Sequence, residues 1–157
     1  MLICALMLAS CDNNPKIKPL ESEAKAVKAD KSDMLLGYDL DKDGIREDVE
    51  EYIRTLSITD EQKAASRFEA KVLQSVLVVD TEDPDALKKS NKSMMAAINC
   101  MNSRFDDYED ADAIGVSLED RTFNTSTRAA AYKKYNKAQE AAELVIEIPT
   151  GDSCETV

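Results

Sequence analysis

The chain has 157 residues, of which 31 are acidic, 20 are basic and none is histidine, and its formal net charge is −11. This length fits one domain with appendages. So acidic a chain lacks the Lys/Arg footprint that nucleic acids require, and we expect no nucleic-acid partner. The charge suits cation binding, a basic protein partner or solubility alone.

Residues 1–10 are uncharged and almost all apolar. The run is shorter than the about 20 residues that span a hydrocarbon core, and it fits the apolar part of a removable secretory signal. The run ends in Leu8-Ala9-Ser10, and Cys11 follows it. These four residues resemble the lipobox of bacterial lipoproteins. That resemblance implies cleavage before Cys11, lipid on this cysteine, and a protein anchored in the cell envelope that faces the periplasm. Several acyl chains are needed for a stable anchor.

Two features qualify this interpretation. No Lys or Arg precedes Lys16, whereas signals begin with a positive region, so we expect the natural start to lie upstream of Met1. Asp12 after the cysteine resembles the inner-membrane retention signal of enterobacterial lipoproteins and favours the inner over the outer membrane. The alternative is a chance apolar N-terminus with an ordinary buried cysteine.

Residues 11–32 are expected to form a tether behind the lipidated cysteine. The first part contains two prolines and no apolar periodicity, and residues 12–32 hold five lysines and four acidic residues. Such a linker would hold a domain clear of a bilayer. The excess of acidic residues therefore belongs to the domain that we expect over residues 33–157.

From Glu47 onward the apolar spacing is helical. Thr59-Asp60-Glu61-Gln62 is a capping box, and Asp83-Pro84 and Thr125-Ser126 are typical helix starts. A shorter helix is expected over residues 109–121. The expected buried faces are Ile45, Val49, Tyr52 and Leu56; Ala65, Phe68, Val72, Val76 and Val79; Leu87, Met94, Ile98, Met101 and Phe105; Ala111, Ile114 and Leu118; and Ala131, Tyr135, Ala138, Ala142 and Val145.

These patterns predict an all-α fold, a small bundle of about four to five helices. Residues 76–79 and 144–146 could instead form short buried strands, because both runs are rich in branched apolar residues. We interpret them as helix ends, since clean apolar–polar alternation is absent from the sequence.

Residues 39–50 carry the clearest chemical signal and match the pattern D-x-[DN]-x-[DN]-G-x₅-E. A hard cation such as Ca²⁺ takes six to eight oxygen ligands, and a glycine permits the sharp turn between them. The expected ligands are the side chains of Asp39, Asp41, Asp43, Glu47 and Glu50 and the main-chain carbonyl of Ile45. The alternative is an acidic helix N-terminus, which the helix dipole favours, but this leaves the alternating aspartates and Gly44 without a reason.

The loop resembles EF-hand loops in its ligands but departs from them in two ways. The apolar Ile45 directly follows Gly44, and residues 34–38 do not form a convincing incoming helix. Both features are similar to the single calcium loops of dockerins and thrombospondin type 3 repeats. Residues 43–50 with Tyr52 and Ile53 also resemble a motif of uncharacterised exported proteins of proteobacteria.

Four cysteines are present. If Cys4 leaves with the signal and Cys11 carries lipid, Cys100 and Cys154 remain, and a single pair in an exported chain indicates a disulfide that ties back the C-terminal tail. Two unpaired thiols are the alternative.

No catalytic residue is predicted. The absence of histidine removes the usual general base, and no nucleophile motif or phosphate-binding loop is present. We expect a non-enzymatic, calcium-stabilised binding or adaptor module with an unknown protein partner. The alternative is an immunity or inhibitor-type lipoprotein that caps a basic envelope enzyme or toxin.

Overall fold

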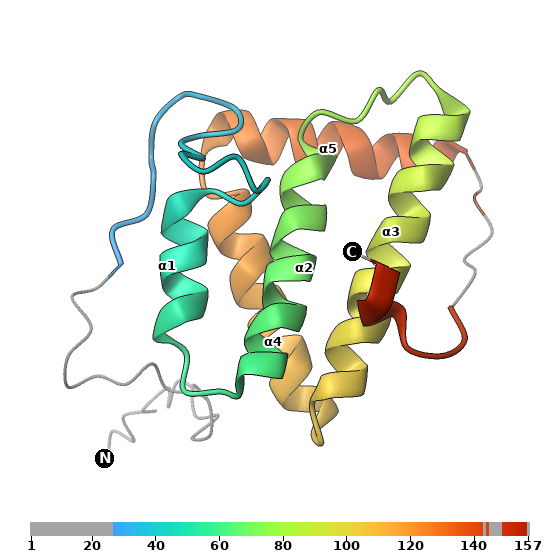
Figure 1. Ribbon diagram of the computed structural model, residues 1–157. Coiled ribbons are helices and arrows are strands. Elements are labelled where there is room, and N and C mark those ends of the chain that lie inside the picture. The colour runs from blue at the N-terminus through green and yellow to red at the C-terminus, as the bar shows by residue number, and fades with distance from the viewer. Residues whose placement is uncertain (1–26, 143, 145–148, 157) are drawn as a thin grey trace, which may run out of the picture.

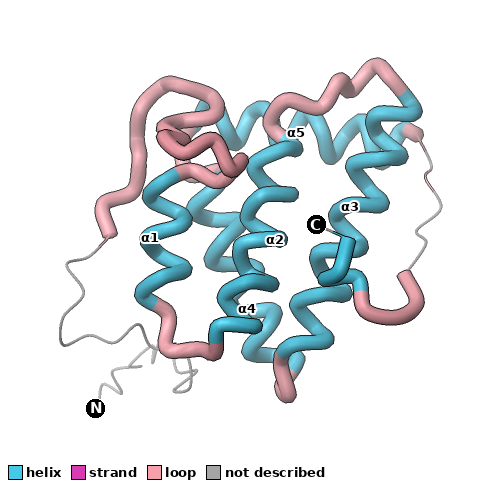
Figure 2. Tube along the Cα trace, viewed as in Figure 1, coloured by secondary structure: helices cyan, strands magenta, loops and turns pink. Residues whose placement is uncertain are grey.

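A computed structural model describes residues 27–142, 144 and 149–156. Within them the chain is helical and contains no strand, which confirms the all-α prediction (Figure 2). None of the described helices is long and apolar enough to cross a membrane. The elements are α1 (Glu47–Thr55), α2 (Asp60–Val76), α3 (Pro84–Arg104), α4 (Tyr108–Thr122), α5 (Ser126–Ala141) and a short 3₁₀ helix, η1 (Ser153–Thr156).

Side-chain caps set the starts of four helices. Thr59 Oγ1 accepts a hydrogen bond from Gln62 N at 3.2 Å, and Thr59 N donates to Gln62 Oε1 at 3.0 Å, so the predicted capping box is confirmed. At the N-cap positions of α3, α4 and α5, the side chains of Asp83, Asp107 and Thr125 likewise accept hydrogen bonds from backbone N–H groups. Each cap satisfies a backbone N–H that has no partner within the helix, which is why these polar residues begin helices.

Helices α1, α2 and α3 lie side by side, α4 packs behind them, and α5 crosses behind the upper ends of α2 and α3 (Figure 1). The main core lies between α1, α2, α3 and α4 and includes Ile53, Leu73, Met101 and Leu118. A second cluster, centred on Val76, Leu87 and Tyr135, joins α5 to the bundle.

The predicted faces of α1 and α4 are fully confirmed, because Ile45, Val49, Tyr52 and Leu56 and also Ala111, Ile114 and Leu118 are buried. On α3 the prediction is wrong at Ile98, which is 38% exposed, because the face that meets α2 is centred on Ala97 and Cys100. Residues 77–79 form a turn after α2 and no strand. Val145 lies outside the described residues.

The disulfide between Cys100 and Cys154 is present and joins α3 to η1. Polar contacts hold the same tail to α3: Ser153 Oγ donates to Ala96 O at 2.9 Å, and Arg104 pairs with Asp152 at 2.6 Å. The tail therefore docks along α3, as Figure 1 shows for the red segment.

Two fully buried arginines, Arg46 and Arg128, fasten the segment ahead of α1 to the bundle. Arg128 on α5 donates to the carbonyl oxygens of Asp30, Met34 and Leu35 at 2.8 to 3.1 Å, and it pairs with the Asp30 carboxylate at 3.2 Å. Contacts with the bundle thus include Asp30, which lies ahead of the boundary that composition suggests. Only a guanidinium offers enough fixed donors to satisfy so many buried acceptors.

Candidate metal centre

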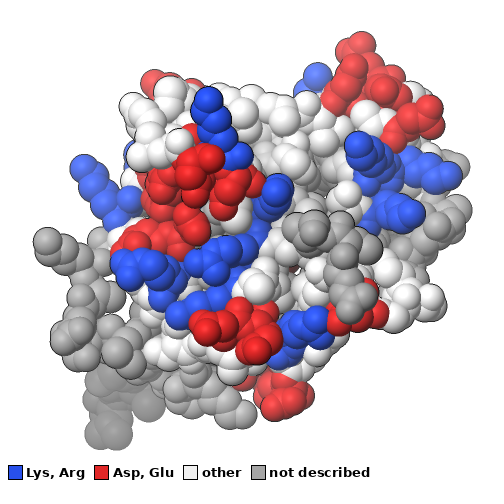
Figure 3. Space-filling view, viewed as in Figure 1, with Lys and Arg blue, Asp and Glu red and all other residues white. Residues whose placement is uncertain are grey.

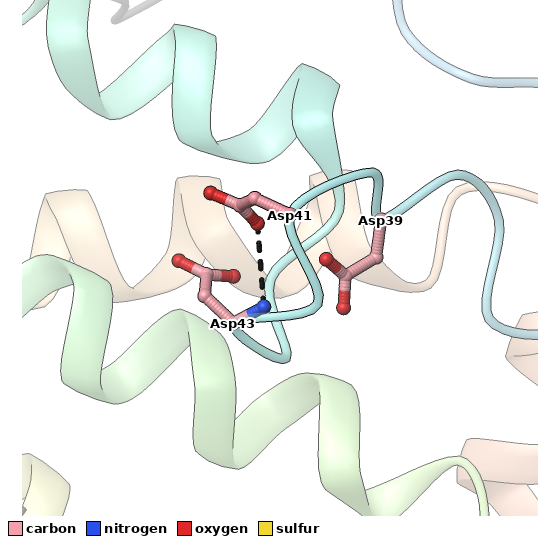
Figure 4. A group of neighbouring side chains, drawn as sticks. All are labelled: Asp39, Asp41 and Asp43. Atoms are coloured by element: carbon pink, nitrogen blue, oxygen red, sulfur yellow. Dashed lines mark hydrogen bonds between the residues drawn. The ribbon is translucent and has the colours of Figure 1, made fainter.

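Asp39, Asp41 and Asp43 converge in the loop that precedes α1 (Figure 4). One carboxylate oxygen from each lies within 4.8 Å of the others. In Figure 4 the Asp39 side chain is directed across the loop toward the other two. The structure therefore brings together the three alternating aspartates of the predicted ligand set.

Backbone hydrogen bonds orient these carboxylates. Gly44 N donates to Asp39 Oδ2 at 3.0 Å, Asp43 N donates to Asp41 Oδ1 at 3.2 Å, and Ile45 N donates to Asp43 Oδ1 at 2.7 Å. Each aspartate thus uses one oxygen to hold the turn and has a second oxygen for another ligand.

Among the oxygens of the cluster, Asp39 Oδ1 gives the strongest indication of a ligand. It is buried and has no hydrogen-bond partner among the described residues. A buried carboxylate oxygen without a partner is unfavourable, because it has lost its hydration without replacement. A cation shared with Asp41 and Asp43 would remove that penalty and also the mutual repulsion of three negative charges.

The remaining predicted ligands make other contacts. Glu47 Oε1 accepts from Leu40 N at 2.7 Å and so closes the base of the loop. Glu50 pairs with Arg67 of α2 at 3.2 Å. Neither glutamate belongs to the group of converging oxygens in the described chain.

The three converging oxygens fit a calcium ion in size. Ca²⁺ binds oxygens at about 2.3–2.6 Å, so two ligands of one ion lie no more than about 5.2 Å apart. The 4.8 Å limit of the cluster meets this condition. Three carboxylates supply fewer than the six oxygens that Ca²⁺ prefers, and Glu47, Glu50, the Ile45 carbonyl or water would complete the shell.

Two backbone positions shape the turn. Gly44 has φ +93°, a conformation that a side chain makes costly, and a Cβ there would lie 3.3 Å from Cε of Lys71 on α2. Lys42 also has a positive φ, at +62°. The positive φ of Gly44 therefore explains the glycine of the sequence pattern, and the Lys71 side chain would have to shift to admit a Cβ.

The loop is attached to the core through Arg46, the residue before α1. Its guanidinium forms an ion pair with Asp48 and donates to the carbonyl oxygens of Arg121 and Thr122 at the end of α4. Gly37 passes so close that a Cβ there would lie 2.2 Å from Arg46 Cδ. The aspartate cluster is thus held between a rigid entry segment and the first turn of α1.

The segment ahead of the cluster alternates between inward and outward residues. The Leu35 carbonyl oxygen and Gly37 face the buried arginines, and the Asp39 side chain points into the loop, where it accepts a hydrogen bond from Gly44 N. The intervening side chains are apolar and between 43% and 78% exposed. They are Met34, Leu36, Tyr38 and Leu40.

Charge on this face of the molecule is mixed. In Figure 3 acidic side chains gather at the upper left, where Figure 1 places the loop ahead of α1, and Lys and Arg side chains border them. A second acidic group lies at the upper right, over the connection between α2 and α3. This view therefore offers local acidic clusters and no continuous acidic surface for a basic partner.

Comparison of the chain with protein-family models, with curated proteins and with solved structures finds no match. The assignment of the site therefore rests on its residues. Residues 8–11, on which the lipoprotein prediction rests, and Asp12, on which the inner-membrane prediction rests, lie outside the described residues.

Sequence reasoning missed the buried charged residues Arg46, Glu69 and Arg128. For Glu69 and Arg128, the helical spacing of the neighbouring apolar residues indicated burial. Glu69 lies four residues after Ala65 and three before Val72, and Arg128 lies three before Ala131, so both occupy positions on faces that were expected to be buried.

Proposed function

We propose that this protein is a non-enzymatic binding module of the bacterial envelope, whose partner-binding segment is stiffened by Ca²⁺. The observation that carries the calcium assignment is the convergence of Asp39, Asp41 and Asp43 around a buried, unpartnered Asp39 Oδ1 within the described chain. The lipobox at residues 8–11 supports a lipid anchor on Cys11 and hence a periplasmic location.

The exposed apolar side chains of residues 34–40 support a role in binding. Rows of large exposed apolar residues mark interaction surfaces more often than isolated ones do. This row leads from the residues that Arg128 contacts into the aspartate cluster. A cation in the loop would therefore limit the motion of the C-terminal end of the row. Calcium would act as a structural clip and not as a sensor, because a sensor needs a paired loop and a groove to open.

Thermal unfolding with and without Ca²⁺ tests the metal assignment. A lone extracytoplasmic loop binds with a Kd of about 10⁻⁴–10⁻³ M, so millimolar Ca²⁺ should stabilise the domain by about 1 kcal/mol and raise Tm by about 4 °C relative to excess chelator. Asp39→Asn should abolish this difference, because the sequence pattern admits only Asp at this position. Asp106→Asn, an exposed aspartate outside the loop, is the matched control and should retain it. Equal Tm values with Ca²⁺ and chelator would refute calcium binding.

Membrane fractionation tests the anchor. Cys11→Ser should move the protein from the membrane to the soluble fraction, whereas Cys4→Ser, within the expected signal, should not. Retention of the Cys11→Ser protein on the membrane would refute lipidation.

Co-purification tests the binding role. The lipidated protein is isolated from cells in Ca²⁺ or chelator, and its companions are identified. A specific partner should be retained in Ca²⁺ and lost when Leu36, Tyr38 and Leu40 are replaced by serine. A companion that is insensitive to both changes would count against this surface.

A further inference from the structure

A cavity of about 410 Å³ lies between α2, α3, α4 and α5, away from the aspartate loop. Its volume is within the range of small-molecule sites. Much of the wall is apolar or aromatic: Met94 and Ile98 come from α3, Tyr108 from α4, and Tyr132 and Tyr135 from α5. The space exists because α3 and α4 both pack on α2, whereas α5 crosses only one end of the bundle (Figure 1).

Glu69 of α2 lines this cavity, although it is only 8% exposed. Its Oε2 is buried and has no hydrogen-bond partner among the described residues. Gly115 of α4 lies against the same carboxylate, since a Cβ there would be 3.1 Å from Oε1. A carboxylate in this position calls for a donor, because an unpaired buried charge is strongly unfavourable.

Gln139 of α5 contributes a second unsatisfied acceptor to the same cavity. Its Nε2 donates to Leu87 O and to the hydroxyl of Tyr135, which identifies its Oε1 as the free acceptor. That oxygen is also buried without a partner in the described part of the chain. Two buried acceptors without a hydrogen-bond partner among the described residues therefore line one cavity.

The charge around the cavity is negative. Asp112 and Glu119 of α4 lie at its exposed edge, and no Lys or Arg is among the described residues that line it. Burial first, and then repulsion from Glu119 and Asp112, raises the pKa of Glu69 to about 7. The other titratable side chains on the wall are Tyr108, Tyr132 and Tyr135. A bound cation would relieve the repulsion that adds to the effect of burial.

We propose that this cavity binds a small organic cation, with an ammonium or guanidinium group at Glu69 and Gln139 and a slim apolar body along the methionine and tyrosine walls. Such cations are pure donors and match two acceptors, and tyrosine faces attract them. A divalent metal fits less well, because Glu69, Asp112 and Glu119 do not form a group of converging oxygens among the described residues. The site is separate from the calcium loop and goes beyond the proposed function.

The probes are phenethylammonium and hexylammonium, with 2-phenylethanol as the uncharged analogue. Binding is followed by NMR of the protein labelled at its methionine methyl groups. Met94 and Met101 line the cavity and should shift, whereas Met34, on the segment ahead of the loop, should not. Affinity should increase from about pH 6 to about pH 8, because Glu69 becomes ionised over this range.

Glu69→Gln is the decisive variant, since it keeps the shape of the side chain and removes its charge. It should weaken binding of both amines at least about tenfold, because a charge-assisted hydrogen bond is lost. Glu82→Gln, an exposed glutamate between α2 and α3, is the matched control and should bind like the wild type. Asp39→Asn, which removes a proposed calcium ligand, should also leave this binding unchanged.

Three results would overturn the proposal. They are equal amine affinity in the wild type and the Glu69→Gln variant, equal affinity for 2-phenylethanol and phenethylammonium, and the absence of Met94 and Met101 shifts with both amines at millimolar concentration. Binding of a lysine-containing peptide where neither amine binds would assign the cavity to a protein partner and would also overturn it.

Discussion

Replacing Glu69 with glutamine should change the pH dependence of folding stability. The carboxyl group is nearly buried, and its pKa in the folded state is raised from 4.5 to about 7 by burial and by repulsion from Glu119 and Asp112. In the unfolded chain the same group titrates near its ordinary value. Between these two values the folded state holds a proton that the unfolded state has lost, so the free energy of unfolding decreases as pH rises.

The magnitude follows from the size of the shift. Each pKa unit corresponds to about 1.4 kcal/mol, so a shift from 4.5 to about 7 amounts to about 3 kcal/mol. This stability is fully present below pH 4.5 and is lost by about pH 7, above which both states are ionised and the contribution is constant. The glutamine variant has no such titration, so its stability relative to the wild type should increase by about 3 kcal/mol across that window.

Urea unfolding followed by far-UV circular dichroism, at a fixed Ca²⁺ concentration from about pH 5 to about pH 8, measures this difference. Carboxyl groups that do not interact with Glu69 titrate in both proteins and cancel in the comparison. Among them is Asp30, where burial alone raises the pKa but hydrogen bonds from Ser32 and the charge of Arg128 hold it below its usual value. Glu82→Gln should show no pH-dependent difference. A constant difference between Glu69→Gln and the wild type would refute the buried, repelled carboxylate.

Three further substitutions test what holds the molecule together, each measured by urea unfolding. Arg128→Ala should lower stability by about 3–5 kcal/mol, because it removes the partner of Asp30 in an ion pair with a fully buried arginine and leaves the carbonyl oxygens of Met34 and Leu35 without this donor; a loss below about 1 kcal/mol would contradict this account. Gly37→Ala should lower the free energy of unfolding by about 2 kcal/mol or more, since φ is +69° and the new Cβ would meet Arg46. An unchanged midpoint of urea unfolding would show that the segment can move aside. Cys154→Ser should lower the free energy of unfolding by up to about 4 kcal/mol, which is the chain-entropy value for a cross-link over a separation of 54 residues. Reductant should destabilise the wild type but not this variant.

The helical elements could be predicted because their signals are local. The Thr59 capping box, the Asp83-Pro84 start and the spacing of Ile45, Val49 and Tyr52 depend on residues within one or two turns of each other. The aspartate turn is local as well, since Gly44 and the alternating carboxylates lie within a few residues and form hydrogen bonds with their own backbone. The disulfide could be predicted by counting, on the assumption that two other cysteines are removed or lipidated.

Only the tertiary structure decided what lies beside these elements. Arg128 is an ordinary helix-forming residue until the chain near Asp30, 98 positions away, brings its carbonyls to the guanidinium. Glu69 becomes a buried acid because α4 approaches it at Gly115, and it shares a cavity with Gln139 of α5. Burial and charge repulsion depend on distances between helices, which a single sequence does not contain. The sequence alone therefore determined the helices and the aspartate turn, whereas packing determined the buried arginines and the second candidate site.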